Sequence, residues 1–391
     1  EYANIDITTP VNAPVDPYLP AGATYLLDAD NTVTTNDLDG NNLAFTYYPA
    51  RYWVWIDTSG EGNVDAIDQH TLIEIKAGTA VCAAGTAATK AQQVAGAGCM
   101  LRPYAEEMQN FANWFSYHRS RELTAKYSMS QVMANATNVR MGVATINENV
   151  TAAQVGMASM DNLYTVGGNK RNLLNAMAQI NSTNSTPLRN ALERAGNYYS
   201  CSGTRPNFSV ASTCAIQKTP AGAAPGACQQ NFTILMSDGE RNGGNPGVGN
   251  SDAANTTFSG FEPYQDGESN TLADVAMEYY ATDLDAVLPD NVPMICGVDE
   301  NSAQHMVTYT VGFGVTGDLD LSTIPAHPKL GIPAGCTTSP AAADFPWATG
   351  AIDTGAERID DMVHAAFNGR GEYLSAQDPE ALSDSLNNAL R

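Results

Sequence analysis

Residues 228–242, CQQNFTILMSDGERN, constrain the fold more than any other stretch. An apolar run from Phe232 to Leu235 has the length of a buried strand. Asp238 and a glycine follow the run, so a carboxylate stands where the strand stops. Open α/β sheets bind ligands at the carboxyl ends of their strands. The stretch therefore predicts a strand that presents Asp238 at the ligand-binding edge of an α/β sheet.

Residues 185–197, STPLRNALERAGN, predict a helix whose start supplies a second oxygen. Thr186 is a good N-cap, Pro187 suits the first helical position, and apolar residues repeat at helical spacing. Taken singly, Thr186 is a plain helix cap and Asp238 an acid in a turn. Together, a hydroxyl and a carboxylate are hard oxygen ligands that suit Mg²⁺ or Ca²⁺. Thr186 and Asp238 are therefore candidate ligands of one such cation.

The composition of the 391-residue chain excludes several classes of function. A net charge of −23 argues against binding to nucleic acid and against electrostatic binding to anionic membranes. No apolar run approaches the roughly 18 residues of a membrane span. The start at Glu1 has no signal-like segment, so we expect a mature protein or a fragment. These features favour an exported protein.

Seven cysteines also favour export, because several lie in Gly/Ala/Ser-rich loops of the kind that disulfides staple. None forms a CxxC pair, so a zinc site is not expected. The expected bridges are Cys82–Cys99 and Cys296–Cys336, with Cys201, Cys214 and Cys228 competing for one more. The cysteine left over pairs outside this chain or stays free.

Signs of catalysis are missing from the sequence. The histidines show no HxxxH or HxH spacing, and we expect each to be an ordinary core or surface residue. No G-x-S-x-G elbow and no nucleophile–base pair is visible. The glycine-rich stretch 243–249 lacks the Lys-Ser/Thr of a phosphate cradle and is expected to be a loop beside Asp238. We therefore expect a protein that is not an enzyme.

Strands that alternate with helices predict a mostly parallel, doubly wound α/β sheet. Residues 1–103 show loops and short strands, among them an aromatic β pattern at 52–56 and a partner strand at 72–76. Residues 104–135 predict one long amphipathic helix. The later elements expected are strands at 139–146, 306–313 and 372–375, helices at 173–180, 271–288 and 359–367, and a last helix capped by Asp378. Long loops are expected at 200–230, 240–269 and 315–356.

Seven stretches in order resemble the von Willebrand factor A-like domain of the PilY/PilC family of type IV pilus tip-associated adhesins. They are NFANWFSYHRSREL (110–123), RMGVATIN (140–147), STPLRNALERAGNYY (185–199), CQQNFTILMSDGERN (228–242), SNTLADVAMEYYATDL (269–284), QHMVTYTVGFGVTG (304–317) and RIDDMVHAAFNGRGEYLSAQDPEAL (358–382). The resemblance implies that 104–391 form the A-like domain and that 1–103 form a β/loop-rich insertion. It also implies a fragment, since the family's C-terminal β-propeller is absent.

The A-domain metal site, called MIDAS, takes its first ligands from a D-x-S-x-S motif, and a threonine and an aspartate complete it. Thr186 and Asp238 match the last two, but D-x-S-x-S occurs nowhere in this sequence. In the family this motif belongs to a central strand. We expect residues ahead of Glu1, or another stretch, to fill that place. One candidate is Asp57-Thr58-Ser59-Gly60-Glu61, where Glu61 replaces the second serine.

Residues 57–68, DTSGEGNVDAID, have a second interpretation as a calcium loop. The pattern is similar to an EF-hand or dockerin loop, although its flanks are strand-like. The oxygen ligands would come from Asp57, Ser59, Glu61, Asp65 and Asp68, with the carbonyl of Asn63. The plainest interpretation is a solvated acidic hairpin turn.

The resemblance implies a non-enzymatic role in pilus assembly, adhesion and twitching motility. The implied partners are minor or major pilins, a host, abiotic or cell-surface ligand, and the rest of its own chain. In the first hypothesis the loops around Thr186 and Asp238 bind the partner with help from Mg²⁺ or Ca²⁺. In the second hypothesis the domain is a disulfide-stapled spacer or minor filament component with a non-functional metal site.

Overall fold

The computed structural model of the chain describes residues 33–34, 44–45, 51–56, 69–75, 77–86, 93–94, 96–118, 121–148, 153–160, 165–180, 185–204, 206, 208, 214–217, 226–238, 241–340, 345, 347 and 355–376. They fall into two compact units, Glu1–Thr124 and Ala125–Arg391. The domain division expected at residue 103 stays a prediction. In the described part of the chain, no helix has the length and apolar character needed to cross a bilayer. The helix expected from Asp378 lies outside the described residues.

The first unit is built around a β-hairpin and a helix. Strands β3 (Arg51–Ile56) and β4 (Gln69–Glu74) pair antiparallel, which confirms the aromatic strand and its partner. Ile73 and Ile75 are buried and pack with Met108 of helix α2 (Tyr104–His118). Two short strands, β1 (Val33–Thr34) and β2 (Ala44–Phe45), pair separately. Alternation of apolar side chains therefore places one hairpin face against α2.

The prediction of a single long helix over 104–135 is wrong. Helix α2 ends at His118, and α3 (Arg121–Asn135) begins three residues later. The hydroxyl of Thr124 donates to the His118 carbonyl at 3.2 Å, a capping contact at the end of the first helix. Helical spacing of apolar residues continues across the break, which explains why periodicity alone did not reveal it.

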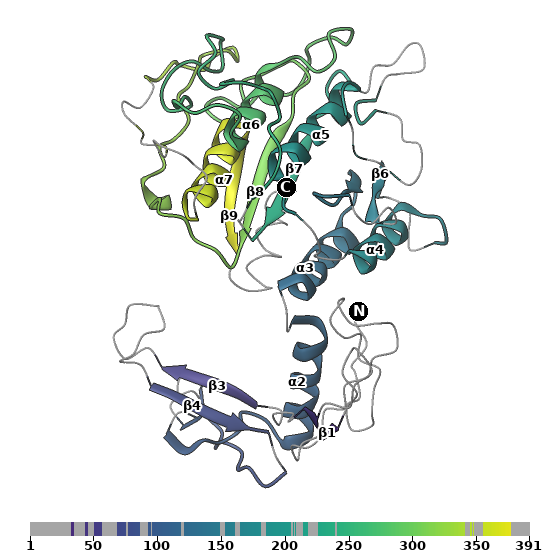
Figure 1. The fold of residues 1–391 in the computed structure, drawn as a ribbon, viewed down its shortest axis with the longest axis vertical. Coiled ribbons are helices and arrows are strands. Elements are labelled where there is room, and N and C mark those ends of the chain that lie inside the picture. The colour runs from purple at the N-terminus through teal and green to yellow at the C-terminus, as the bar shows by residue number, and fades with distance from the viewer. Residues whose placement is uncertain are drawn as a thin grey trace. The chain divides into compact units, whose positions relative to one another are not determined.

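The second unit contains a parallel sheet in the order β7-β8-β9. Its strands are β7 (Phe232–Ser237), β8 (Val307–Phe313) and β9 (Arg370–Ala376), which lie side by side in Figure 1. Register is continuous from Phe232 opposite Val307 to Ser237 opposite Gly312. The strands predicted at the Asp238 stretch, at 306–313 and at 372–375 are thus confirmed.

Helices cover both faces of this sheet. Ile234 and Met236 of β7 pack with Val132 of α3, whereas the intervening Leu235 packs with Leu192 on the opposite face. That opposite face is covered by α5 (Leu188–Ser200), α6 (Leu272–Ala281) and α7 (Glu357–Asn368). The alternation of β7 side chains between two apolar layers is the pattern of a strand buried on both sides.

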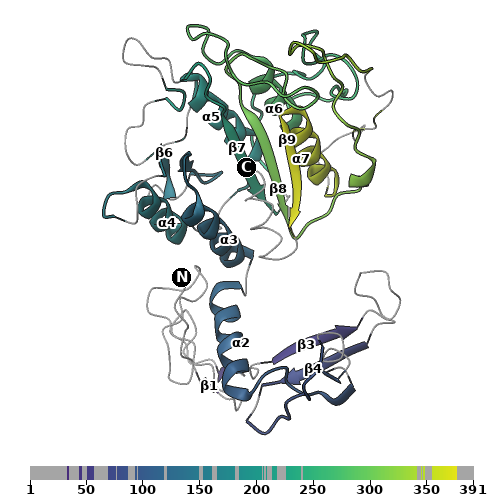
Figure 2. The same cartoon turned by 180° about the vertical axis from the view of Figure 1, so that it is seen from behind.

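A second strand pair, antiparallel, joins β5 (Arg140–Val143) to β6 (Val155–Ser159). Helix α4 (Asn169–Gln179) packs with α3 beside this pair, as both cartoon views show (Figures 1 and 2). The buried strand expected at 139–146 is shorter than predicted and only half-buried. The helix expected at 173–180 is confirmed within α4.

Helix α6 has a sequence-encoded start. The Thr271 hydroxyl accepts from the Asp274 amide, and the Asp274 carboxylate accepts from the Thr271 amide, a reciprocal capping box. The helix ends at Ala281, not at the expected residue 288, and Leu284 enters the core from the following turn. The chain is thus a mixed α/β protein with a three-stranded parallel sheet in its described part.

Candidate functional site

The carboxyl end of β7 lies beside the start of α5. Helix α5 begins at Leu188 with Pro187 as its N-cap, and the cap makes no side-chain hydrogen bond. The expected role of Thr186 as N-cap is therefore wrong by one residue. The carbonyl of Thr186 instead accepts from the amides of Leu188 and Asn242, both at 2.9 Å. Thr186 is half-buried, and Asp238 is exposed directly after β7.

Asn242 ties the two predicted ligand segments together. Its Oδ1 accepts from the Thr186 amide at 2.6 Å while its own amide donates to the Thr186 carbonyl. Asn242 follows Asp238 by four residues, so this two-way pairing joins the start of α5 to the chain leaving β7. We use the name rim for Thr186, Asp238 and Asn242, the residues before α5 and on the chain leaving β7.

A buried ion pair lies behind the rim. The Arg241 guanidinium is 3.2 Å from the Asp361 carboxylate, and both side chains are at most 3% exposed. The same carboxylate accepts from the amides of Leu272 and Ala273 at the start of α6. Negative charge at a helix N-terminus is favourable, and here Arg241 compensates it as well. The chain leaving β7 is thereby anchored to α6 and α7.

The glycine-rich loop beside the rim is anchored by Arg189 of α5. Its guanidinium donates to the Gly243 carbonyl and to the Asn270 carbonyl, both at 3.0 Å. Asn270 also pairs with Gly249 through its amide and its Oδ1. These bonds close residues 249–270 into a loop whose two ends meet near the start of α5.

The donor set at the rim fits a hard cation in part. Thr186 and Asp238 offer one hydroxyl and one carboxylate, which is suitable chemistry for Mg²⁺ or Ca²⁺. Either ion takes about six or more oxygen ligands, so two side chains leave most of the shell to water or to a partner. Because the sequence has no D-x-S-x-S motif, the rim supplies only the later half of the metal-site pattern.

The acidic stretch 57–68 lies outside the described residues. The structure shows its two flanks, where Ile56 of β3 stands opposite Gln69 of β4. The stretch therefore connects two paired antiparallel strands, as its strand-like flanks predicted. The placement of its candidate ligands Asp57, Ser59, Glu61, Asn63, Asp65 and Asp68 stays a prediction.

Three disulfides stabilise the described loops. They join Cys82 to Cys99, Cys201 to Cys214 and Cys296 to Cys336, and Cys228 is free and exposed. Both pairs predicted from spacing are confirmed, and the competition for the third bridge excludes Cys228.

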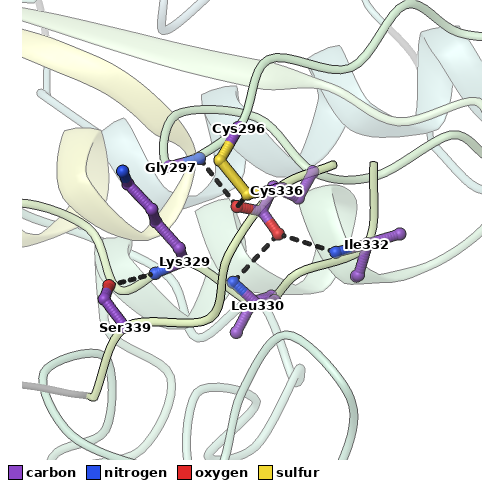
Figure 3. Close-up of a disulfide and its surroundings, with 8 residues drawn as sticks. Cys296, Gly297, Lys329, Leu330, Ile332, Cys336 and Ser339 are labelled. Atoms are coloured by element: carbon purple, nitrogen blue, oxygen red, sulfur yellow. Dashed lines mark hydrogen bonds between the residues drawn. A yellow bond between two sulfur atoms is a disulfide. The ribbon is translucent and has the colours of Figure 1, made fainter. Parts of the chain in front are cut away.

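The Cys296–Cys336 bridge is reinforced by a buried carboxylate (Figure 3). Glu300 accepts from the Gly297 amide at 2.7 Å and from the Leu330 and Ile332 amides at 2.9 and 3.3 Å. Because these donors belong to both disulfide-linked segments, one side chain satisfies backbone groups on each.

Sequence reasoning missed a buried polar cluster that connects residues 250–270 to α7. Asp252, Asp266 and His364 place one ligand atom each within 4.8 Å of one another. Asp252 is fully buried and His364 is 3% exposed. The only advance signal was the density of acids in the loop, because spacing along the chain does not relate that loop to a histidine 98 residues after Asp266.

A comparison with curated proteins shows which family this chain resembles. Three relatives, each named "Type IV pilus biogenesis factor PilY1", come from Pseudomonas aeruginosa strains PAK, PAO1 and UCBPP-PA14. They are 30%, 30% and 31% identical over 311, 322 and 312 residues, or 73%, 75% and 74% of this chain. The chain spans only 26–27% of the length of these relatives.

Other comparisons found nothing: no family model matches the chain, and no solved structure matches it. The curated match therefore decides the identity. It extends over about three quarters of the chain, and it names the family that the ordered stretches of the sequence resemble. By this likeness the protein belongs to the PilY family.

Proposed function

We propose that this chain is a non-enzymatic adhesion and assembly module of a type IV pilus tip-associated protein. Its curated relatives are named type IV pilus biogenesis factors, which supports a role in the pilus. Disulfides in both units support an exported protein at the cell surface or pilus tip, because such bonds persist in oxidising surroundings. A von Willebrand factor A-like arrangement is the finer fold we propose, with α/β layers around β7, β8 and β9.

The observation that carries this proposal is the rim. Thr186 and Asp238 come from segments 52 residues apart in the sequence, and the Thr186–Asn242 pairing brings those segments together. The rim lies at the carboxyl end of a parallel strand, where α/β sheets bind ligands. Asp238 is exposed there, so a pilin, a surface ligand or another part of the same protein can reach it.

A bound Mg²⁺ or Ca²⁺ would be held by the Thr186 hydroxyl and the Asp238 carboxylate. The ion would offer open positions to a partner carboxylate. A second calcium position is proposed at the hairpin loop 57–68. Neither ion is required for the rim to present hydrogen-bonding groups to a partner.

The test compares two strains that express the full-length protein with Asp238→Ala or with Asp290→Ala. Asp290 is also exposed and lies in a loop remote in sequence from the rim. We expect Asp238→Ala to reduce surface piliation, attachment or twitching several-fold, and Asp290→Ala to leave all three unchanged. Equal protein levels by immunoblot are the control for stability. Wild-type behaviour of the Asp238→Ala strain at equal levels would refute binding through the rim.

The second candidate function is a disulfide-stapled spacer or minor filament component. The observation that favours it is the cross-linking of the loops, with Glu300 reinforcing the Cys296–Cys336 bridge. In that case the double variant Cys296→Ala/Cys336→Ala reduces piliation while Asp238→Ala does not. The opposite result, in which Asp238→Ala reduces piliation and the double cysteine variant does not, favours binding through the rim.

A further inference from the structure

The buried polar cluster of the second unit has more negative charge than its surroundings compensate. Asp252 and Asp274 are fully buried, and the Asp266 side chain is 7% exposed. Among the described residues, the ion pairs of these carboxylates are with His364 only: Asp252 at 3.6 Å and Asp266 at 3.3 Å. Two carboxylates therefore share one imidazole, and the Asp274 carboxylate beside them accepts from the Asp252 amide at 3.3 Å.

Within the part of the chain that the structure describes, no other cation forms an ion pair with these carboxylates. The guanidinium of Arg370, a buried residue close by in sequence, donates to the carbonyls of Asn368 and Phe258 and stacks on the rings of Tyr264 and Tyr280. Backbone amides contribute partial compensation, since Asp252 accepts from the Asp266 amide and Asp274 accepts from the Thr271 amide. Buried charge of this kind is normally paired or bound to a metal.

His364 is oriented as a metal ligand would be. Its Nε2 lies 2.7 Å from the Tyr264 carbonyl, and because a carbonyl only accepts, Nε2 carries a hydrogen. Nδ1 is then the nitrogen available for coordination, and it lies 3.3 Å from Asp266 Oδ2, whereas Asp252 Oδ2 lies 3.6 Å from Nε2. Metal-bound histidines commonly donate their other N–H to a backbone carbonyl. The Trp347 ring stacks on the imidazole at 3.9 Å and fixes its plane.

Asn368 supplies an oxygen without a partner. The residue is fully buried; its Nδ2 donates to Asp252 Oδ2 at 3.1 Å and to the Ala273 carbonyl at 3.5 Å, while its Oδ1 has no hydrogen bond. Rotation of the amide by 180° exchanges the two atoms, and Oδ1 then faces the Asp252 carboxylate. Two oxygens so close repel unless a cation lies between them. Two ligand atoms that are each about 2.1 Å from the same ion stand roughly 3.0–3.4 Å apart. The 3.1 Å separation between the Asn368 amide and Asp252 Oδ2 lies in this range.

We propose that Asp252, Asp266, Nδ1 of His364 and Oδ1 of Asn368 bind one divalent transition-metal ion. One imidazole with oxygen ligands suits Zn²⁺ or Mn²⁺, whereas Mg²⁺ and Ca²⁺ take oxygen alone. Burial raises the pKa of Asp252 to about 7.

The site would stabilise the loop that borders the rim. Residues 249–270 are closed at their ends by the Gly249–Asn270 pairing, and the metal would fix the interior of the same loop to α7. The proposal does not rest on the proposed function, because the ligands lie in the core and differ from the rim residues.

The experiment uses the chain in a Cys228→Ser background, so that the exposed thiol cannot bind metal. After dialysis against a chelator, Zn²⁺ and Mn²⁺ are titrated calorimetrically, and thermal unfolding is measured with and without each ion. We expect one ion per chain and a rise in Tm. Added Co²⁺ should give visible absorption of nitrogen and oxygen ligation without a thiolate charge-transfer band.

The variants are Asp266→Asn, close in shape to the original, and Asp290→Asn as a matched exposed control. We expect Asp266→Asn to weaken Zn²⁺ binding by about 100-fold or more, and Asp290→Asn to leave it unchanged. Near-ultraviolet circular dichroism establishes whether each variant is folded. Absence of stoichiometric binding by the unsubstituted site overturns the proposal, as does wild-type affinity in a folded Asp266→Asn variant. If Asp266→Asn does not fold, the Co²⁺ spectrum of the unsubstituted site decides alone.

Discussion

The rim and the buried cluster both contain aspartates, but their surroundings differ completely. Asp238 is exposed after β7, and the chain that follows it is held at Asn242, whose Oδ1 accepts from the Thr186 amide and whose backbone amide donates to the Thr186 carbonyl. Asp252 is fully buried and depends on His364, Asn368 and backbone amides for every contact. An exposed acid is available to partners at little cost in stability. A buried carboxylate is tolerated in its charged form only where the fold supplies a counter-charge.

Breaking a buried ion pair should give the largest effect. We expect Arg241→Met to destabilise the chain by about 3–5 kcal/mol, because it leaves Asp361 buried with its charge partly uncompensated. Methionine keeps most of the apolar stem, so the effect reports the charge. The measurement is urea unfolding of the purified chain, monitored by circular dichroism.

The matched control is Arg102→Met in the first unit. Arg102 is also 3.2 Å from a carboxylate, that of Glu107, but its side chain is 46% exposed, against 3% for Arg241. Solvent screening should limit this loss to about 1 kcal/mol or less. Equal losses for the two variants would show that burial does not control these pairs.

Measuring stability across a pH series tests how burial affects a histidine. Burial, reinforced by the charge of Arg370, lowers the pKa of His327 to about 3. Because the unfolded chain protonates this group near pH 6.5 and the folded chain does not, stability falls as the pH drops from about 6.5 towards 3. We expect His327→Gln to remove on the order of 2 kcal/mol of the loss seen between pH 7 and 4.5.

The measurement for His327 is the free energy of unfolding of both proteins at each pH, taken at constant ionic strength. His327 stacks on Phe367 at 4.2 Å and contacts the Tyr264 hydroxyl, so Gln also costs some packing at every pH. Parallel pH profiles for the two proteins would contradict the assignment.

The smallest effect is expected at the rim. Asn242→Ala removes an exposed acceptor of the Thr186 amide and should cost about 1 kcal/mol or less. Asn242→Asp retains an acceptor oxygen and should restore most of that loss. A loss of several kcal/mol on Asn242→Ala would show that the rim is part of the structural core.

Local sequence patterns predicted most of the second unit. The apolar run before Asp238 became β7, and the Thr271–Asp274 box starts α6 as its chemistry requires. The bridges Cys82–Cys99 and Cys296–Cys336 were expected from cysteines in Gly/Ala/Ser-rich loops, and both are present. These features depend on neighbours in the chain, so sequence alone is sufficient for them.

Other predictions failed where tertiary contacts outweigh local preference. Thr186 has the chemistry of a helix cap, but Asn242 from a distant loop takes its main-chain groups, and α5 begins one residue later than predicted. The helix expected over 104–135 breaks near His118 without a proline or glycine to mark the break. Periodicity reports which residues are apolar and says nothing about the contacts that end a helix.

The sequence by itself determined the three strands of the parallel sheet, two of the disulfide pairings and the likeness to pilus proteins, since these depend on local pattern and on similarity along the chain. Only the tertiary structure decided that Asn242 joins the two halves of the rim. It alone also brought two loop aspartates to His364 of α7, at 3.3 and 3.6 Å in the core. Packing of distant segments creates such juxtapositions, and the one-dimensional spacing of polar residues does not record them.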